Sequence, residues 1–204
     1  MFRIVRFDLL VRYTALLTIA ISISAYSFIR EYWLPDFSLF KIVTISSIVS
    51  TAIILILLSP YISRKLWAFK CRIDRSSFPD LNGTWEGVVT LENGNTLPVR
   101  AVIRQSLLST QIDMHGETTK SITLETTPTL EQGQKKLYYV YRSTPKNPSW
   151  PSYNGSTLFD IRLVKTEQSE HLELSGNYYT DRKSVGRIAI KQTSDDFNID
   201  VSYY

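Results

Sequence analysis

Two apolar segments close to the start of the chain constrain its fold most strongly. The first, residues 9–29, holds 21 residues; the second, residues 42–58, holds 17 residues without a charge, and flanking apolar residues extend it to 38–61. Because a helix rises about 1.5 Å per residue, about 20 apolar residues cross a hydrocarbon core of about 30 Å. We therefore predict two transmembrane helices, over 9–29 and 38–61.

A secretory signal peptide is the alternative interpretation of the first segment, since Arg3 and Arg6 precede it. The apolar core of a signal peptide is about 7 to 15 residues long, which is shorter than this segment, and here a second span follows. We therefore interpret both segments as spans.

Basic residues near the spans predict the orientation of the chain. Most of them lie on the side of the two chain ends: Arg3, Arg6, Arg64, Lys65, Lys70, Arg72 and Arg75, with Arg12 about one turn inside the first span. The connecting loop carries only Arg30 and Lys41. Because lysine and arginine concentrate in cytoplasmic segments, we expect both termini in the cytosol. The single cysteine, Cys71, excludes an internal disulfide framework and is compatible with a reducing compartment.

The net positive charge of the chain lies in its N-terminal part, residues 1–77, which contains the two predicted spans. The pI is about 9.1, but residues 1–77 hold ten Lys or Arg against four Asp or Glu, a net charge of +6, whereas residues 78–204 hold thirteen against fifteen, a net charge of −2. Binding to long nucleic acids scales with the number of phosphates neutralised. We therefore exclude DNA and RNA as partners and keep open a small ligand with one or two phosphates.

Residues 78–204 are predicted to form a cytosolic domain of short strands, behind a membrane anchor and basic linker over 1–77. Segments rich in β-branched and aromatic residues recur at 84–92, 97–105, 108–115, 120–127, 135–143, 156–165, 170–180, 186–192 and 197–204. Regular spacing favours an all-β sandwich or barrel. Eight or nine sequential strands suit a meander that closes on itself around one small ligand. We predict an up-and-down antiparallel β-barrel of about eight strands.

Alternation along the strands predicts which side chains face inward. In the first strand we place Trp85, Val89 and Leu91 inside. The inner face of strand 170–180 begins apolar and continues to Tyr178, Thr180 and, just beyond the strand, Arg182. At one mouth of a barrel these three would offer an aromatic plane, a hydroxyl and a guanidinium to a ligand. The alternative is that Arg182 lies in a loop and Tyr178 fills the core.

A connection rich in proline and aromatic residues, 143–155, is a second candidate region, since long loops in compact barrels are often functional. Its Trp150 and Tyr153 would cover a base, and Lys146 would meet a phosphate. The alternative is a stiff connection whose tryptophan packs on the barrel end. We also assign Tyr141 and Arg104, from two other strands, to the ligand-binding residues.

Catalytic patterns are nearly absent. The two histidines, His115 and His171, have no partners at a metal-ligand spacing, and Asp195 and Asp196 are adjacent carboxylates that would point apart. Neither a phosphate-binding glycine loop nor a GxSxG or HExxH motif is present. We therefore predict a binding protein that is not an enzyme and has no metal or cofactor.

Two short segments carry a family resemblance. The segment 81–87 (LNGTWEG) opens the predicted barrel, and the segment 176–182 (GNYYTDR) leads to Gly186, Arg187 and Ile188. Together with the two spans, they resemble the CD-NTase-associated effectors of bacterial CBASS anti-phage systems, in their two-transmembrane, β-strand-rich class. Lipocalin-like barrels open with comparable patterns, so the combination of features carries the resemblance.

The resemblance implies a function for the chain. It implies a receptor in the bacterial inner membrane for a cyclic dinucleotide, which a partner nucleotidyltransferase makes during phage infection. Ligand binding would drive homo-oligomerisation of the anchors, membrane disruption and abortive infection. The sequence leaves two alternatives open: a tethered lipocalin-like barrel that binds a lipid or other apolar molecule, and a purely structural or partner-docking domain with a filled core.

Overall fold

The computed structural model describes the chain apart from residues 1–6, 33–38, 74–77, 107–108, 166–169 and 204. The described chain falls into two compact units, one that ends at Leu66 and one that begins at Trp67. The first unit contains two long helices, and the second contains all the described β-strands.

Three helices precede the strands: α1 (Phe7–Tyr32), α2 (Leu39–Leu58) and α3 (Pro60–Ile73). The window Val11–Phe28 of α1 is long and apolar enough to cross a membrane. Segments Ser47–Ile56 and Tyr61–Phe69 meet the same test only as a pair, bent by 74°. By length and composition the described helices therefore supply one candidate span, or two if the bent pair counts as one.

The predicted continuous helix over 38–61 is wrong at its C-terminal end. The last helical hydrogen bonds of α2 run from the Ser59 N–H to the carbonyls of Leu55 and Ile56, at 3.1 and 3.2 Å. Pro60 follows, has no N–H to extend the ladder, and stands at the first position of α3, where proline is tolerated. The sequence therefore breaks the helix at Ser59.

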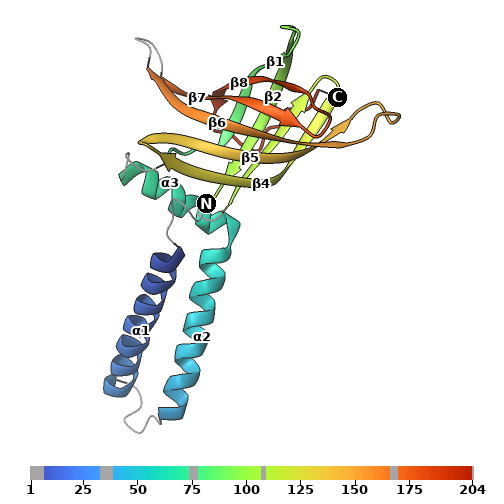
Figure 1. Cartoon of the computed structure of the whole chain (residues 1–204). Coiled ribbons are helices and arrows are strands. Elements are labelled where there is room, and N and C mark those ends of the chain that lie inside the picture. The colour runs from blue at the N-terminus through green and yellow to red at the C-terminus, as the bar shows by residue number, and fades with distance from the viewer. Residues whose placement is uncertain (1–6, 33–38, 74–77, 107–108, 166–169, 204) are drawn as a thin grey trace. The chain divides into compact units, whose positions relative to one another are not determined.

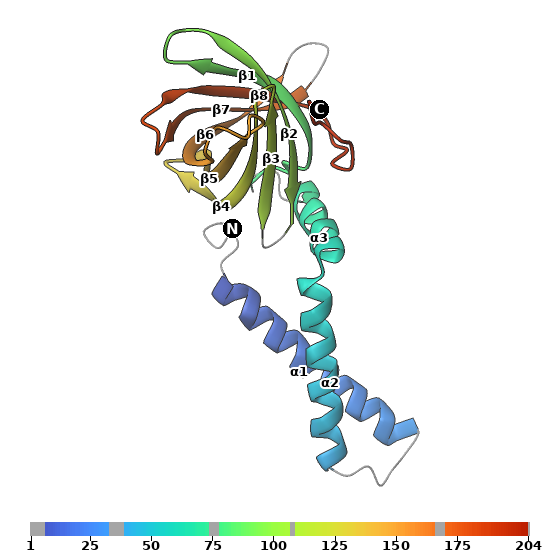
Figure 2. The same ribbon diagram turned by 90° about the vertical axis from the view of Figure 1, so that its right-hand side faces the viewer.

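The second unit is a closed antiparallel barrel in which each strand pairs with its neighbours in sequence and β8 pairs with β1 (Figures 1 and 2). The strands are β1 (Gly83–Leu91), β2 (Thr96–Gln105), β3 (Thr110–Gly116), β4 (Thr119–Glu131), β5 (Gln134–Pro145), β6 (Tyr153–Lys165), β7 (Glu170–Thr180) and β8 (Val185–Ser194). The predicted eight-stranded up-and-down barrel is confirmed.

The ninth strand, expected over 197–204, is not formed by the described residues of that range. Because β1 already pairs with both β2 and β8, the closed sheet offers no edge to a further strand. The C-terminal segment instead packs against side chains of the barrel. The Lys146 Nζ donates a hydrogen bond of 2.9 Å to the carbonyl of Tyr203, and the Arg100 guanidinium lies 4.5 Å from the centre of the Tyr203 ring.

Glycines with a positive φ lie in two of the hairpin turns. Gly94 has a φ of 83°, and its N–H donates to the carbonyl of Leu91 at 2.9 Å, which closes the β1–β2 turn. In the β4–β5 turn, Gln132 and Gly133 have φ values of 49° and 80°. Two successive positive φ values are characteristic of the type I′ turn, whose twist matches the flanking strands.

One end of the barrel, where β1 begins, is filled by side chains. Large residues with almost no exposure meet there: Leu81, Trp85, Ile103, Ile112, Leu137, Phe159 and Leu174. The Trp85 indole N–H donates to the carbonyl of Leu81 at 3.1 Å. The Gln105 side chain accepts from the N–H of Leu81 at 2.6 Å, so the segment entering β1 is tied to the end of β2.

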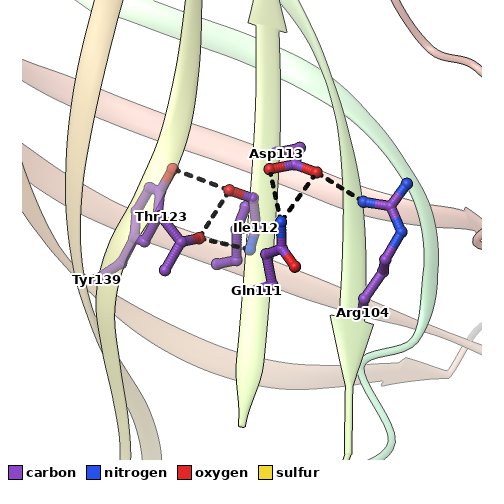
Figure 3. Close-up of polar contacts among 6 residues, drawn as sticks. All are labelled: Arg104, Gln111, Ile112, Asp113, Thr123 and Tyr139. Carbon is purple, nitrogen blue, oxygen red and sulfur yellow. Dashed lines mark hydrogen bonds and ion pairs between the residues drawn. The ribbon is translucent and has the colours of Figure 1, made fainter. Parts of the chain in front are cut away.

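The barrel has a seam between β3 and β4 that side chains close. Among the described residues these strands share two paired positions, Met114 with Ser121 and His115 with Lys120. Beyond them the Thr123 hydroxyl accepts from the N–H of Ile112 at 2.7 Å and donates to its carbonyl at 2.8 Å (Figure 3). A register shift in β4 between Thr123 and Glu125 accompanies this change, as at a β-bulge.

Candidate functional site

The end of the barrel opposite the filled one contains a cavity of about 220 Å³. Residues of all eight strands line it. Its apolar wall consists of Val89, Leu91, Leu97, Val99, Met114 and Ile188. Its polar residues are Glu117, Thr118, Thr119, Ser121, Tyr139, Tyr141, Tyr153, Tyr178, Thr180, Arg182 and Ser184. The cavity therefore combines an apolar side with many hydroxyl groups.

Stacked aromatic rings form one side of the cavity. The rings of Tyr139 and Tyr141 lie with their centres 4.9 Å apart and their planes at 26°. Tyr139 also stacks on Phe159 of the filled end, at 6.1 Å, and its hydroxyl donates to the Ile112 carbonyl at 3.3 Å (Figure 3). Through Tyr139, this side of the cavity contacts both the core and the β3–β4 seam.

Burial raises the pKa of two tyrosines in the cavity. The pKa of Tyr141 is raised far above its ordinary value by burial and, to a lesser degree, by Tyr153 and Tyr178. Burial also raises the pKa of Tyr178. At neutral pH both phenols are uncharged, as tyrosines ordinarily are, and each offers a hydrogen-bonding hydroxyl and a flat apolar face.

Two glycines, which have no side chain, make room for the rings of Tyr141 and Tyr178. Gly155 is the cross-strand partner of Tyr141, and a Cβ at Gly155 would collide with the Tyr141 ring. Gly186 is the partner of Tyr178, and a Cβ at Gly186 would come within 2.7 Å of the Tyr178 hydroxyl. Each tyrosine therefore lies over a bare backbone on the next strand, which limits the positions that its ring can take.

Arg182 supplies a positive charge to the rim of the cavity. Its guanidinium lies 4.3 Å from the centre of the Tyr153 ring and donates a hydrogen bond to the Pro151 carbonyl. Within the part of the chain that the structure describes, no carboxylate forms an ion pair with Arg182. The β7–β8 turn that carries it is closed by the Ser184 N–H, which donates to the Thr180 hydroxyl at 3.2 Å.

The structure brings four of the seven predicted site residues together. Tyr178, Thr180, Arg182 and Tyr141 all line the cavity, although they come from three different segments. The inward alternation predicted for β7 is therefore confirmed. Tyr178 is nonetheless buried, at 7% exposure, so it contributes to the core as well as to the cavity wall. Whether these residues bind a ligand stays a prediction.

The other three predicted residues do not line the cavity. Arg104 lies on the outer face of β2, because its neighbours Ile103 and Gln105 point inward, and its guanidinium pairs with Asp113 at 2.6 Å (Figure 3). Trp85 points inward as expected but belongs to the filled end of the barrel. Trp150 lies in the β5–β6 connection and is 53% exposed. Our placement of Arg104 and Trp85 at the site is therefore corrected.

Sequence reasoning missed three polar residues of the cavity, Tyr139, Ser121 and Ser184. Tyr139 was not selected, although the same alternation that points Tyr141 inward applies to it. Ser121 and Ser184 carry no signal beyond being small and polar. Lys146, expected to meet a phosphate, does not line this cavity and donates a hydrogen bond to the Tyr203 carbonyl.

The family of the chain follows from a comparison with protein families. The model for "Cap15, cyclic dinucleotide receptor domain" matches residues 76–192, which contain β1 to β7 and most of β8. The chain belongs to this family. The match includes both segments that carried the resemblance, so the expected relation to CBASS effectors is confirmed. None of the curated proteins matches the chain.

Proposed function

We propose that this chain is a CBASS effector whose barrel binds a cyclic dinucleotide in the cavity lined by Tyr141, Tyr178 and Arg182. The observation that carries the proposal is an aromatic and hydroxyl-rich cavity with a rim arginine, in a domain of the Cap15 receptor family. Because the matching family is a receptor domain, we propose a receptor and not an enzyme.

The chemistry of a cyclic dinucleotide suits these groups. The ligand presents two flat bases and two phosphates. Stacking on an aromatic side chain is worth about 1 to 3 kcal/mol per base, and charge-assisted hydrogen bonds from arginine to phosphate are about twice as strong as neutral ones. Affinities between micromolar and nanomolar need about 8 to 12 kcal/mol. Stacking together with contacts from Arg182 and the hydroxyls can supply this without a basic surface.

The size of the cavity determines how such a ligand would enter. Ligand sites usually enclose about 300 to 1,000 Å³, and this cavity holds about 220 Å³. We therefore propose that one base enters beside Tyr141 while the phosphates and the second base stay at the rim. Arg182 would then leave the Pro151 carbonyl to meet a phosphate. Trp150, exposed in the adjoining connection, stays a candidate to cover the outer base.

The membrane part of the proposal rests on the apolar helices. We propose that α1 and α2 both cross the bacterial inner membrane, that residues 1–77 are the anchor, and that both termini and the barrel of 78–204 face the cytosol. A partner nucleotidyltransferase would supply the ligand. Ligand binding would favour homo-oligomers, membrane disruption and abortive infection. A ligand shifts assembly only through its higher affinity for the assembled form, so the self-association must depend on the ligand.

Titration of the full chain in lipid nanodiscs against a panel of cyclic di- and trinucleotides tests the proposal. We expect at least one cyclic dinucleotide to bind with a Kd at or below the micromolar range and to raise the thermal unfolding midpoint. Linear dinucleotides of the same bases serve as controls, because they lack the constrained ring. Absence of binding by every member of the panel would remove the receptor function.

A further inference from the structure

We propose that the barrel has a second site, on the outside of its filled end beside α3, that binds an anionic phospholipid of the membrane. This proposal goes beyond nucleotide binding and depends only on the chain being held at a membrane. The site is a cavity of about 640 Å³ between the C-terminal part of α3 and the ends of β5, β6 and β7. It is separate from the cavity that contains Tyr141, since the two share no lining residue.

The floor of this second cavity is apolar. Ile161 and Leu163 of β6 and Leu172 of β7 line it, and Leu163 is 52% exposed although it is a large aliphatic residue. On the other side the cavity is bounded by Ala68 and Cys71 of α3, and the Cys71 thiol contacts the Phe78 carbonyl at 3.4 Å. These side chains offer a surface that an acyl chain would cover.

The rim of the second cavity carries charge of both signs, but its carboxylates already have hydrogen-bond or ion-pair partners. Asp80 accepts hydrogen bonds from the backbone N–H and the side-chain amide of Asn82, at 3.1 and 2.6 Å. Glu170 pairs with Lys165 at 3.3 Å. Arg72 and Lys135 have no acidic partner among the residues that the structure describes. Two uncompensated cations next to an apolar floor match a phosphate head group joined to an acyl chain.

The course of the chain favours a membrane lipid over a soluble anion. Ala68 follows Leu58, the last residue of α2, by ten residues, and α3 is helical over most of that interval. At about 1.5 Å per residue, the cavity wall therefore begins within about 15 Å of the apolar helix along the chain. α3 also exposes Phe69 at 63% beside its basic residues, a pattern typical of helices that lie at a lipid surface.

Native mass spectrometry of the full chain, purified in detergent and stripped of lipid, tests the proposal. Dioleoyl-phosphatidylglycerol and dioleoyl-phosphatidylcholine are added separately, and the concentration that half-saturates the first bound lipid is measured. We expect the anionic lipid to half-saturate at a concentration at least tenfold lower. In R72Q/K135Q this preference should fall to less than threefold. Equal binding of both lipids by the unmodified chain would overturn the site.

A charge-matched control separates the loss of these two cations from a general loss of positive charge. R162Q/K191Q removes two cations from the exposed outer face of β6 and β8 and should keep the full preference. If R72Q/K135Q keeps it as well, the lipid binds elsewhere and the proposal is wrong. Oleate is a third ligand: half-saturation equal to that of phosphatidylglycerol would mean a fatty-acid site, which also contradicts the proposal.

Two further measurements keep the result interpretable. Leu163→Asp places a charge on the apolar floor and should weaken binding of every lipid to the site, while circular dichroism checks that the barrel remains folded. Cyclic dinucleotide affinity, measured on the same R72Q/K135Q sample, should be unchanged. Loss of lipid preference and loss of nucleotide binding are therefore separate outcomes.

Discussion

The phenol ring of Tyr141 lies over Gly155, its partner on the neighbouring strand, in the space that a side chain at Gly155 would occupy. Tyr178 stands in the same relationship to Gly186. An aromatic ring over a cross-strand glycine covers bare backbone and fixes the register of the pair. The glycines thus position the cavity tyrosines without contacting a ligand themselves.

Gly155→Ala should therefore disturb both stability and binding. The added Cβ would force the Tyr141 ring out of its place, and overpacking of this kind costs about 1 to 3 kcal/mol. We expect the free energy of unfolding in urea to fall by that amount and cyclic dinucleotide affinity to fall more than tenfold. Ser156→Ala, at the exposed neighbouring position, is the control and should change neither. Full affinity in Gly155→Ala would mean that the ring position does not matter.

Arg182→Ala should weaken cyclic dinucleotide binding by more than tenfold while the fold stays intact. The side chain is exposed at the rim, so its removal leaves the core unchanged. The lost contact would be a charge-assisted hydrogen bond to phosphate. Calorimetric titration measures the affinity, and Arg187→Ala, which removes an exposed arginine from β8, is the matched control. An unchanged affinity would leave Arg182 without a role in binding.

Thr123→Val tests the side-chain closure of the seam between β3 and β4. The substitution keeps the shape of the side chain but leaves the N–H and carbonyl of Ile112 without the Thr123 hydroxyl. An unsatisfied buried polar group costs about 1 to 3 kcal/mol, so we expect urea unfolding to show a loss of that size. Hydrogen exchange of the Ile112 amide should also become faster. Thr144→Val, at an exposed position of β5, should have little effect on either measurement.

The buried tyrosines predict a loss of stability at alkaline pH. The folded protein holds the pKa of Tyr141 above the value of about 10 expected in the unfolded chain. Above that pH the unfolded state releases a proton that the folded state retains, so the free energy of unfolding falls as pH rises, by up to about 1.4 kcal/mol per unit for each such group. Urea unfolding between pH 9 and 11 measures this slope. Tyr141→Phe should reduce it, and a slope identical to that of the unmodified chain would contradict the assignment.

Local sequence patterns were sufficient to predict the kind of domain and one face of the candidate site. Regularly spaced strand segments indicated a closed meander, because each segment is a pattern of neighbours along the chain. Alternation placed Tyr178 and Thr180 on one side of β7, since successive side chains of a strand point to opposite faces. The same rule, applied to β2, would have placed Arg104 outside with Arg100.

Proline at position 60 is a local signal of a helix break, which hydropathy alone overlooked. Other features depended on contacts between distant residues. Barrel closure, for example, removed the edge that a ninth strand would need. The depth of Trp85 and the pairing of Tyr141 with Gly155 depend on how far each strand is staggered against the next. Stagger is a property of the closed sheet and has no signature within a single strand.

The sequence by itself determined that this protein has an apolar N-terminal part and an antiparallel barrel, because hydrophobic length and period-two alternation are local properties of the chain. Only the tertiary structure decided which end of the barrel is filled and which is hollow. That outcome depends on where strands in register bring large side chains such as Trp85 and Phe159 to the same level, and where they bring Gly155 and Gly186 beneath tyrosines.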